Sequence, residues 1–169
     1  MLMTTARTNR LVPVVALLFA GIGWSISTVQ APAPFTGAWK LVFASLTTGG
    51  GVTTGNSSPQ PGLVLFTAHH YSLMYVEGSA ARVAFADPLR PTEAEKVVAY
   101  DTFVGHSGTY SVADSLVKMQ PVISKSPNLM GNALGPAFAT FAYSLSGDTL
   151  RLTRYGRAGN FTMKLVRAE

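Results

Sequence analysis

Short segments in which apolar and polar residues alternate recur from residue 37 to residue 167 and predict β-strands. Turns that contain Gly or Asp separate many of these segments, as in an up-and-down antiparallel sheet. Eight strands is about the number at which such a sheet closes into a barrel able to hold one small ligand. The sequence therefore predicts an all-β fold, an eight-stranded up-and-down antiparallel β-barrel, with strands at about 37–45, 62–67, 71–77, 108–113, 116–123, 137–145, 149–155 and 160–167.

One segment, residues 78–106, departs from the alternation of a strand. Within it, Thr92-Glu93-Ala94-Glu95 forms a capping box, in which a Thr and a Glu three residues later satisfy the first backbone N–H groups of a helix. We expect one short helix near residues 92–104, which continues through Tyr100 and stops at Gly105.

The two ends of the predicted barrel differ in the length of their connections. In an up-and-down sheet, the tight turns fall at the end of the barrel that contains Trp39. The opposite end receives the three long segments, residues 46–61, 78–106 and 124–136. Binding and catalytic residues concentrate on long loops held by a rigid scaffold. We therefore expect the mouth of the barrel at the end with the long segments.

The Trp39 end is expected to be closed by its own side chains. With an even number of up-and-down strands, the last strand lies antiparallel beside the first. Alternation puts Trp39 on the same side of its strand as Phe43, and Arg167 on the same side as Phe161. Both patterns predict that Trp39 and Arg167 meet inside the barrel, with the guanidinium stacked on the indole.

The N-terminus predicts export. Arg7 and Arg10 precede an apolar run at residues 11–26, and small residues precede a cut after Ala31. This is the order of a secretory signal peptide, and the run is short for a membrane span. Because signal peptidases disfavour the Pro32 that follows, two alternatives stay open: a cut near Ser27, and an uncleaved N-terminal anchor.

The predicted organisation has three parts. A signal helix occupies residues 1–31, an extended lead-in residues 32–36, and the barrel domain residues 37–169. We expect a secreted or periplasmic protein with no membrane contact beyond the possible anchor.

Composition excludes several chemistries. The chain has no cysteine, which excludes disulfides, thiolate nucleophiles and Cys-ligated zinc. It has no stripe of Lys and Arg interleaved with stacking aromatics, so we expect no nucleic acid partner. His69 and His70 fall in a predicted turn and lack further ligands at metal-binding spacing, so we expect neither a metal nor another cofactor.

The Gly37-x-Trp39 opening with an Arg from the last strand against it is similar to the lipocalin arrangement. Over most of residues 35–167 the chain resembles the bacterial and fungal lipocalin-like domain family. The matching stretches are Gly37-Ala38-Trp39-Lys40-Leu41-Val42, Pro61-Gly62-Leu63-Val64-Leu65-Phe66-Thr67-Ala68, Gly108-Thr109-Tyr110-Ser111-Val112, Ser126-Pro127-Asn128-Leu129-Met130-Gly131 and Gly147-Asp148-Thr149-Leu150-Arg151-Leu152-Thr153.

The resemblance implies a calyx-shaped barrel for small apolar molecules. Related small barrels serve as cyclases or isomerases. The chain departs from the family at His69-His70, where an Asp-Gly turn is usual, and at Met119, Gln120 and Phe138, where His or Arg is frequent. If those family residues are catalytic, this chain has lost them.

Candidate ligand contacts come from the predicted inner face and the rim of the mouth. Apolar candidates form a wall, tyrosines bring hydroxyl groups, and Arg154 offers a partner for a ligand carboxylate. The set is Phe43, Leu65, Tyr75, Tyr100, His106, Tyr110, Met119, Asn128, Phe141, Tyr143, Arg154, Phe161 and Met163. In an eight-stranded barrel, core and ligand wall are the same positions, so the sequence does not separate the two roles.

Three functions remain open, of which we favour binding of a small apolar molecule without catalysis. The alternative is a cyclase or isomerase in which His106, Tyr100 or Arg154 transfers a proton or stabilises charge, with Asp101 as the one plausible carboxylate partner of His106. The third is a structural or protein-interaction barrel that its own side chains fill.

Overall fold

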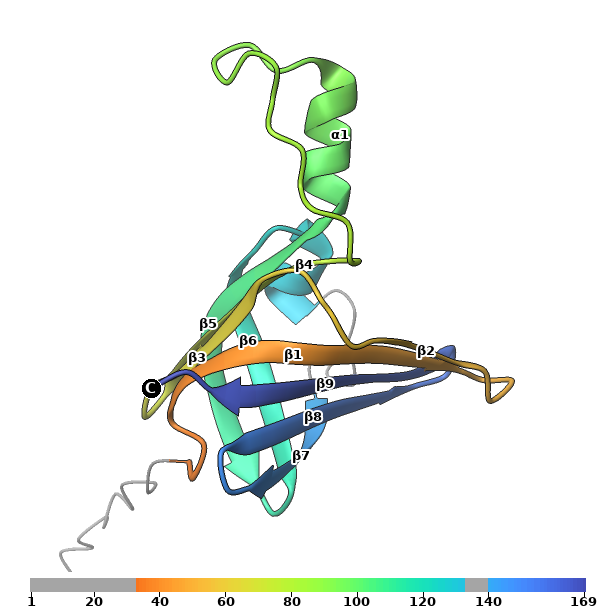
Figure 1. The fold of residues 1–169 in the computed structure, drawn as a ribbon. Helices are drawn as coiled ribbons and strands as arrows, with labels where there is room; N and C mark the ends of the chain where they lie inside the picture. Colours follow the sequence, from red (N-terminus) through yellow and green to blue (C-terminus); the bar gives the residue numbers. More distant parts are fainter. Residues whose placement is uncertain (1–32, 133–139) are drawn as a thin grey trace, which may run out of the picture. The chain divides into compact units, whose positions relative to one another are not determined.

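The computed structural model describes residues 33–132 and 140–169, and the predicted signal peptide lies outside these residues. The strands are β1 (Gly37–Thr48), β2 (Thr53–Asn56), β3 (Gly62–Phe66), β4 (His70–Val76), β5 (Phe103–Ala113), β6 (Leu116–Ser124), β7 (Thr140–Ser146), β8 (Thr149–Gly156) and β9 (Gly159–Arg167). One α-helix, α1 (Glu93–Asp101), and one 3-10 helix, η1 (Pro127–Asn132), complete the described part (Figure 1).

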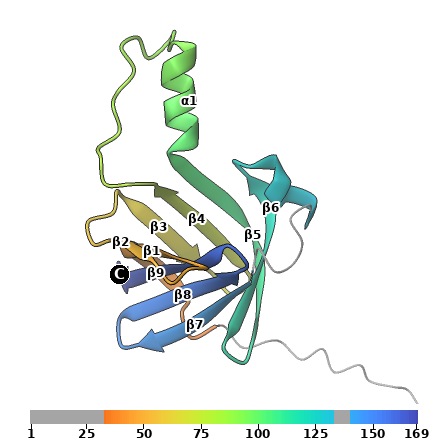
Figure 2. The same ribbon diagram turned by 90° about the vertical axis from the view of Figure 1, so that its right-hand side faces the viewer.

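The strands form a closed antiparallel barrel (Figure 2). Each strand from β3 to β9 pairs with the next, and β9 pairs with β1 from Trp39↔Arg167 to Thr48↔Gly159. β2 and β3 lie along the same side of β1, at its two ends, so together they fill one position in the barrel. The predicted eight-stranded up-and-down barrel is confirmed.

The ends of the barrel are arranged as predicted. The tight turns after β3, β5 and β7 lie at one end, which we call the floor. The connection 77–102 begins and ends at the opposite end, which we call the mouth, and η1, which follows β6, lies there as well. The segment 46–61 is more ordered than expected, because β1 continues to Thr48 and pairs with β2.

A β-bulge in β1 overturns one predicted wall position. Leu41 pairs with Leu165, but the next partners are Phe43 and Lys164, so Val42 is an extra residue in β1. Beyond the bulge every side chain changes face. Phe43 therefore lies outside the barrel, where its ring covers Gly55 of β2, and it does not line the interior.

The prediction that Leu65 lines the interior is also wrong. Its neighbours in β3, Val64 and Phe66, are buried, whereas Leu65 is 37% exposed. Val64 pairs with Trp39, which lies inside the barrel. Since successive strand residues point to opposite faces, Leu65 belongs to the outer surface.

The helix begins where the capping box predicts but ends earlier. The Thr92 side chain accepts a hydrogen bond from the Glu95 backbone N–H, and Glu95 accepts one from the backbone of Thr92. The helix ends at Asp101 rather than Gly105, because the residues from Phe103 onward pair with β4 as part of β5. A strand partner thus overrides the local helical preference.

The floor is closed by Trp39 and Arg167, as predicted. Trp39 is fully buried, and the Arg167 guanidinium carbon lies 4.4 Å from the centre of the Trp39 ring. Arg167 also donates a hydrogen bond to the Thr36 carbonyl oxygen, at 3.1 Å. The Arg167 Nε lies 3.6 Å from a carboxylate oxygen of Asp148.

Residues 33–36, expected as part of an extended lead-in, instead form a turn under the floor. Phe35 is fully buried and meets Phe66 and Tyr143 edge to face, with ring centres 4.8 Å apart in both pairs. The Trp39 indole N–H donates to the Phe35 carbonyl oxygen, at 2.8 Å. Ala33 and Phe35 are therefore part of the core, and the expectation of an extended segment is wrong for residues 33–36.

Candidate functional site

The barrel is packed at its floor and hollow towards its mouth. The buried core includes Trp39, Val117, Leu150 and Leu165 near the floor. Above it lies a cavity of about 460 Å³. The residues that line it are Leu46, Leu73, Tyr75, Glu77, Val104, Gly105, His106, Ser124, Lys125, Ser126, Leu129, Phe141, Arg154, Phe161 and Met163.

Six of the predicted contact residues line this cavity: Tyr75, His106, Phe141, Arg154, Phe161 and Met163. They come from β4, β5, β7, β8 and β9, and alternation turns each of them inward. The structure therefore brings together one predicted hydroxyl, one imidazole, one guanidinium and three apolar side chains.

The other predicted contacts lie elsewhere. Met119 belongs to the buried core, and Tyr110 and Tyr143 pack around Phe35 at the floor. Asn128, in η1, is exposed. Tyr100, on α1, lies at the rim, while Phe43 and Leu65 are on the outer wall as described above.

Several lining residues were not predicted. Leu46 follows the bulge in β1 and would have been placed outside by simple alternation. Val104 and Gly105 lie in β5, whereas the sequence predicts that the helix extends to them. Leu73 is the residue that alternation alone identifies, since it lies two residues from Tyr75 on β4 and therefore shares its face.

The nearest partner of His106 is a buried tyrosine, not Asp101. The Tyr71 hydroxyl and His106 Nδ1 lie 2.8 Å apart, on paired strands β4 and β5. Burial, with a smaller contribution from the positive charge of Arg154, lowers the pKa of His106 to about 4. Burial raises the pKa of Tyr71, so its hydroxyl keeps its proton. A neutral phenol donates well and an imidazole nitrogen accepts well, so Tyr71 donates to Nδ1 and the ring proton of His106 is on Nε2.

Arg154, Tyr75 and Phe161 form a second group in the cavity wall. The rings of Tyr75 and Phe161 are stacked with centres 6.4 Å apart, and the Arg154 guanidinium carbon lies 5.9 Å from the centre of the Phe161 ring. Burial and the negative charge of Glu77 raise the pKa of Tyr75 to about 12, and the charge of Arg154 opposes them. Desolvation lowers the pKa of Arg154 from its high ordinary value, and a guanidinium there keeps its charge.

The rim of the cavity is tied to helix α1 by one reciprocal contact. The Tyr100 hydroxyl donates to the Lys125 carbonyl oxygen, at 3.2 Å. The Lys125 ammonium donates to the Tyr100 carbonyl oxygen and lies 4.1 Å from the centre of its ring. Tyr100 therefore holds a residue that lines the cavity, although it does not line the cavity itself.

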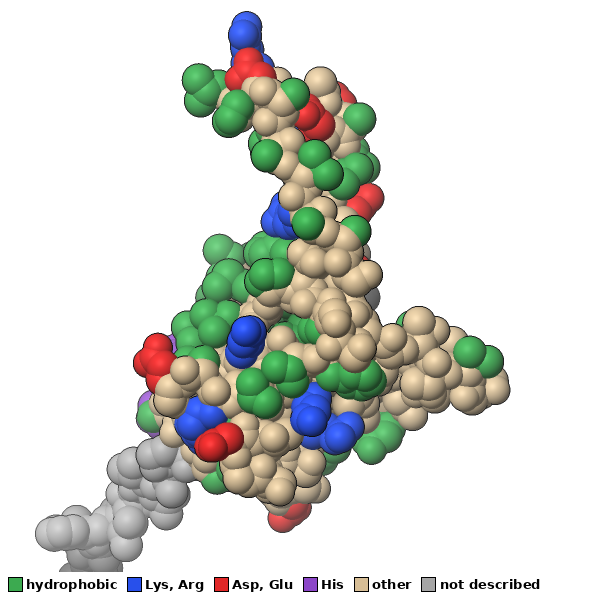
Figure 3. Space-filling view, in the orientation of Figure 1, with side chains coloured by type: hydrophobic (Ala, Val, Ile, Leu, Met, Phe, Trp, Pro, Cys, Tyr) green, Lys and Arg blue, Asp and Glu red, His purple; other side chains and the backbone are tan. Residues whose placement is uncertain are grey.

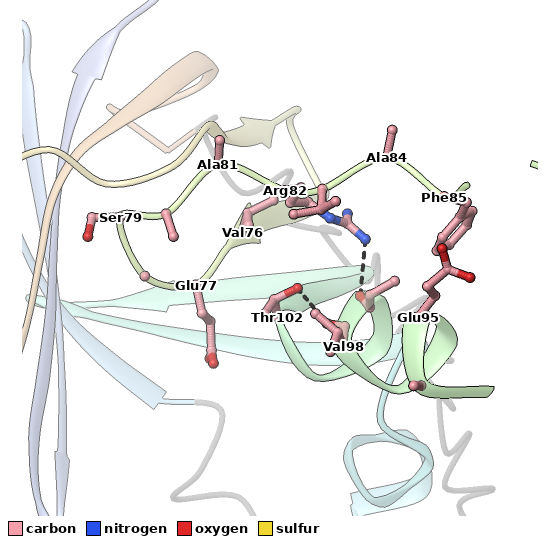
Figure 4. A pocket seen from close by; sticks show the side chains of 15 residues that line it. Val76, Glu77, Ser79, Ala81, Arg82, Ala84, Phe85, Glu95, Val98 and Thr102 are labelled. Carbon is pink, nitrogen blue, oxygen red and sulfur yellow. Dashed lines mark hydrogen bonds between the residues drawn. The ribbon is translucent and has the colours of Figure 1, made fainter. Parts of the chain in front are cut away.

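A second hollow lies between α1 and residues 76–86 (Figure 4). This groove has a volume of about 690 Å³. Its polar groups bridge its two sides: Arg82 donates to the Ala99 carbonyl oxygen at 3.1 Å, and Glu95 accepts from the Ala86 backbone N–H at 2.9 Å. These bonds maintain the groove.

The groove belongs to an arm, residues 77–102, that extends beyond the mouth. No residue of α1 is buried, and hydrophobic side chains are exposed along the arm (Figure 3). The barrel cavity is the stronger candidate site, because its walls are paired strands and its polar groups converge on one space.

The described residues contain neither a cluster of metal ligands nor a membrane-spanning helix. Within residues 33–132 and 140–169, no group of three or more His, Cys, Asp or Glu side chains could hold a metal ion. His69 and His70 lie in and beside the β3–β4 turn, where their backbone N–H groups donate to the Thr67 hydroxyl. In the same described ranges, no helix has the length and apolar character needed to cross a membrane.

Comparison with solved structures gives two similar chains. A lipocalin-like protein from Bacteroides uniformis ATCC 8492 has 14% identity and a TM-score of 0.42, over 78% of this chain and 96% of that one. A de novo designed fluorescence-activating β-barrel has 13% identity and a TM-score of 0.34, over 79% of this chain and 93% of the design. No curated protein matches the chain.

The family comparison is more informative than these two structures. A family model described as a lipocalin-like domain matches residues 36–167. The match begins at the turn under the floor and ends at Arg167, the residue that stacks on Trp39. It thus spans the whole barrel, including both residues that close its floor. The chain belongs to the lipocalin-like domain family.

Proposed function

We propose that the protein binds a small, mainly apolar molecule in the barrel cavity and does not transform it. The observation that carries this proposal is the cavity of about 460 Å³ with a mostly apolar wall that includes Leu73, Phe141, Phe161 and Met163. Ligand pockets range upward from roughly 300 Å³. A barrel filled by its own side chains, the third reading of the sequence, would lack a space of this size.

The polar groups of the cavity favour binding over catalysis. A general base works best when its pKa lies near the working pH. The pKa of His106 is lowered to about 4, and its neighbour Tyr71 keeps its proton, so the pair is a poor acceptor of a substrate proton. The pair is better suited to orient a ligand: Tyr71 donates to Nδ1 of His106, which leaves the Nε2–H of His106 as a hydrogen-bond donor toward the cavity.

Binding is tested by titration with fluorescent apolar probes. Replacing Val104 by Trp adds a large side chain to the cavity wall, whereas Leu65→Trp adds the same side chain to the outer wall. We expect saturable probe binding by the wild type and by Leu65→Trp, and at least about tenfold weaker binding by Val104→Trp because the ligand space is filled. Absence of saturable binding to the wild type, or equal binding by both variants, would contradict the proposal.

We also propose that the protein is exported to the periplasm or the medium. The support is the order of basic residues, apolar run and small residues in positions 1–31. Expression of the full chain, followed by fractionation and mass measurement, tests it. A chain that stays in the cytosol at full mass would refute export, and a full-mass chain in the membrane fraction would identify an uncleaved anchor.

A further inference from the structure

We propose that the cavity takes an amphipathic monoanion, an apolar chain that carries one carboxylate-type head group bound by Arg154, Tyr75 and His106. This inference rests on the proposed binding function and adds the chemical class of the ligand. It predicts which end of the ligand lies at which wall of the barrel.

The three head-group residues share one space. Tyr75 comes from β4, His106 from the paired strand β5, and Arg154 from β8, and all three line the same cavity. Phe161 connects two of them, because Tyr75 stacks on its ring and the guanidinium of Arg154 lies over it. The charge of Arg154 acts on both other groups, since it lowers the pKa of Tyr75 and of His106. The three side chains therefore border one space that a single head group can occupy.

The three groups offer donors with a single positive charge. His106 is neutral, and because Tyr71 occupies Nδ1, its Nε2–H is the donor left for a ligand. Tyr75 keeps its hydroxyl proton. Arg154 supplies the charge, and a guanidinium binds a carboxylate through parallel N–H···O bonds.

The other charged groups of the cavity favour one negative charge over two. Glu77 lines the cavity and repels a second anionic charge. Lys125 also lines it, but its ammonium donates to the Tyr100 carbonyl oxygen and lies over the Tyr100 ring. The rest of the wall is mostly apolar and accommodates a hydrocarbon chain, with Leu46, Leu73, Phe141 and Met163 as its main surfaces.

The test compares ligands that differ only in the head group. Decanoate, decanol and decyltrimethylammonium are titrated by calorimetry into the folded protein at neutral pH. We expect decanoate to bind at least about tenfold more tightly than decanol, since a hydrogen bond to a charged group contributes about 1.5–3 kcal/mol. The cationic ligand should bind more weakly than decanol.

Two variants assign the preference to Arg154. Arg154→Gln should bring decanoate to the affinity of decanol while decanol binding persists. Arg151→Gln, on the outer face of the same strand β8, removes the same charge and should retain the preference for decanoate. Tyr75→Phe, which keeps the ring and its stacking, should reduce the preference in part and serves if Arg154→Gln does not fold.

The outcomes separate the two proposals. If neither decanoate nor decanol binds, the proposed binding function fails. If both bind equally to the wild type, or if neither Arg154→Gln nor Tyr75→Phe reduces the preference, the anionic head-group site fails while apolar binding stands.

Discussion

The partly buried His106 should make the protein lose stability in mild acid. In the folded protein its pKa is lowered from 6.5 to about 4, mainly by burial and secondarily by the charge of Arg154. Between these two values the unfolded chain binds a proton that the folded chain excludes. Stability due to His106 is therefore fully present above about pH 6.5 and is lost as the pH falls to about 4.

The expected size of this effect follows from the linkage between proton binding and folding. One unit of pKa difference corresponds to about 1.4 kcal/mol. The difference between the pKa of His106 in the unfolded and in the folded chain therefore corresponds to a loss of about 3 kcal/mol of stability between the two values. The groups that face the imidazole are Tyr71, Tyr75 and Arg154, with Glu77 further along the same wall. The tyrosines and the arginine ordinarily titrate far above that window.

Urea unfolding at several pH values measures the loss. His106→Asn offers Tyr71 an amide in place of Nδ1 but cannot take up a proton. We expect the free energy of unfolding of the wild type to fall across the window by about 3 kcal/mol more than that of His106→Asn. His70→Asn removes an exposed imidazole and serves as the control. Equal acid sensitivity in the wild type and His106→Asn would refute the reasoning.

Three further changes test the fold. Phe35→Ala should reduce the free energy of unfolding by about 3–5 kcal/mol in urea titration, because it empties the packed turn under the floor; a loss below about 1 kcal/mol would show that the turn is not part of the core. Val64→Ser should destabilise by at least about 2 kcal/mol and Leu65→Ser by less than about 1 kcal/mol, and the reverse order would place β3 in the opposite register. Thr92→Ala removes the helix cap and should lower the local stability of α1 by about 1 kcal/mol. Amide exchange should then be faster in α1 and unchanged in the barrel, and unchanged exchange in α1 would contradict the cap.

The floor of the barrel could be predicted because it depends on two regular features. Strand alternation and an even number of strands put Trp39 and Arg167 on the same side at the same end, and no irregularity lies between them and the floor turns. The guanidinium–indole contact follows from that placement alone.

The upper half of β1 could not be predicted from alternation. The bulge at Val42 adds one residue, which sends Phe43 outward and Leu46 inward. Nothing in the local residue pattern distinguishes a bulge from a regular strand, because both consist of the same apolar residues. The partner strand β9 sets the register.

The boundary between core and cavity is likewise a property of the packed structure. Met119 and Met163 both alternate inward, yet only Met163 lines the cavity. The bond between Tyr71 and His106 joins residues 35 positions apart and depends on the register of β4 against β5. The sequence predicts a role for His106 but indicates Asp101, the nearest carboxylate along the chain, as its partner.

Native mass spectrometry of the protein purified from its own host tests the central claim most directly. The account predicts a mass excess that corresponds to one small molecule per chain, that is absent after extraction with organic solvent, and that is retained by Leu65→Trp but not by Val104→Trp. A spectrum with only the bare chain, together with no uptake of added decanoate or decanol by the extracted protein, would contradict it.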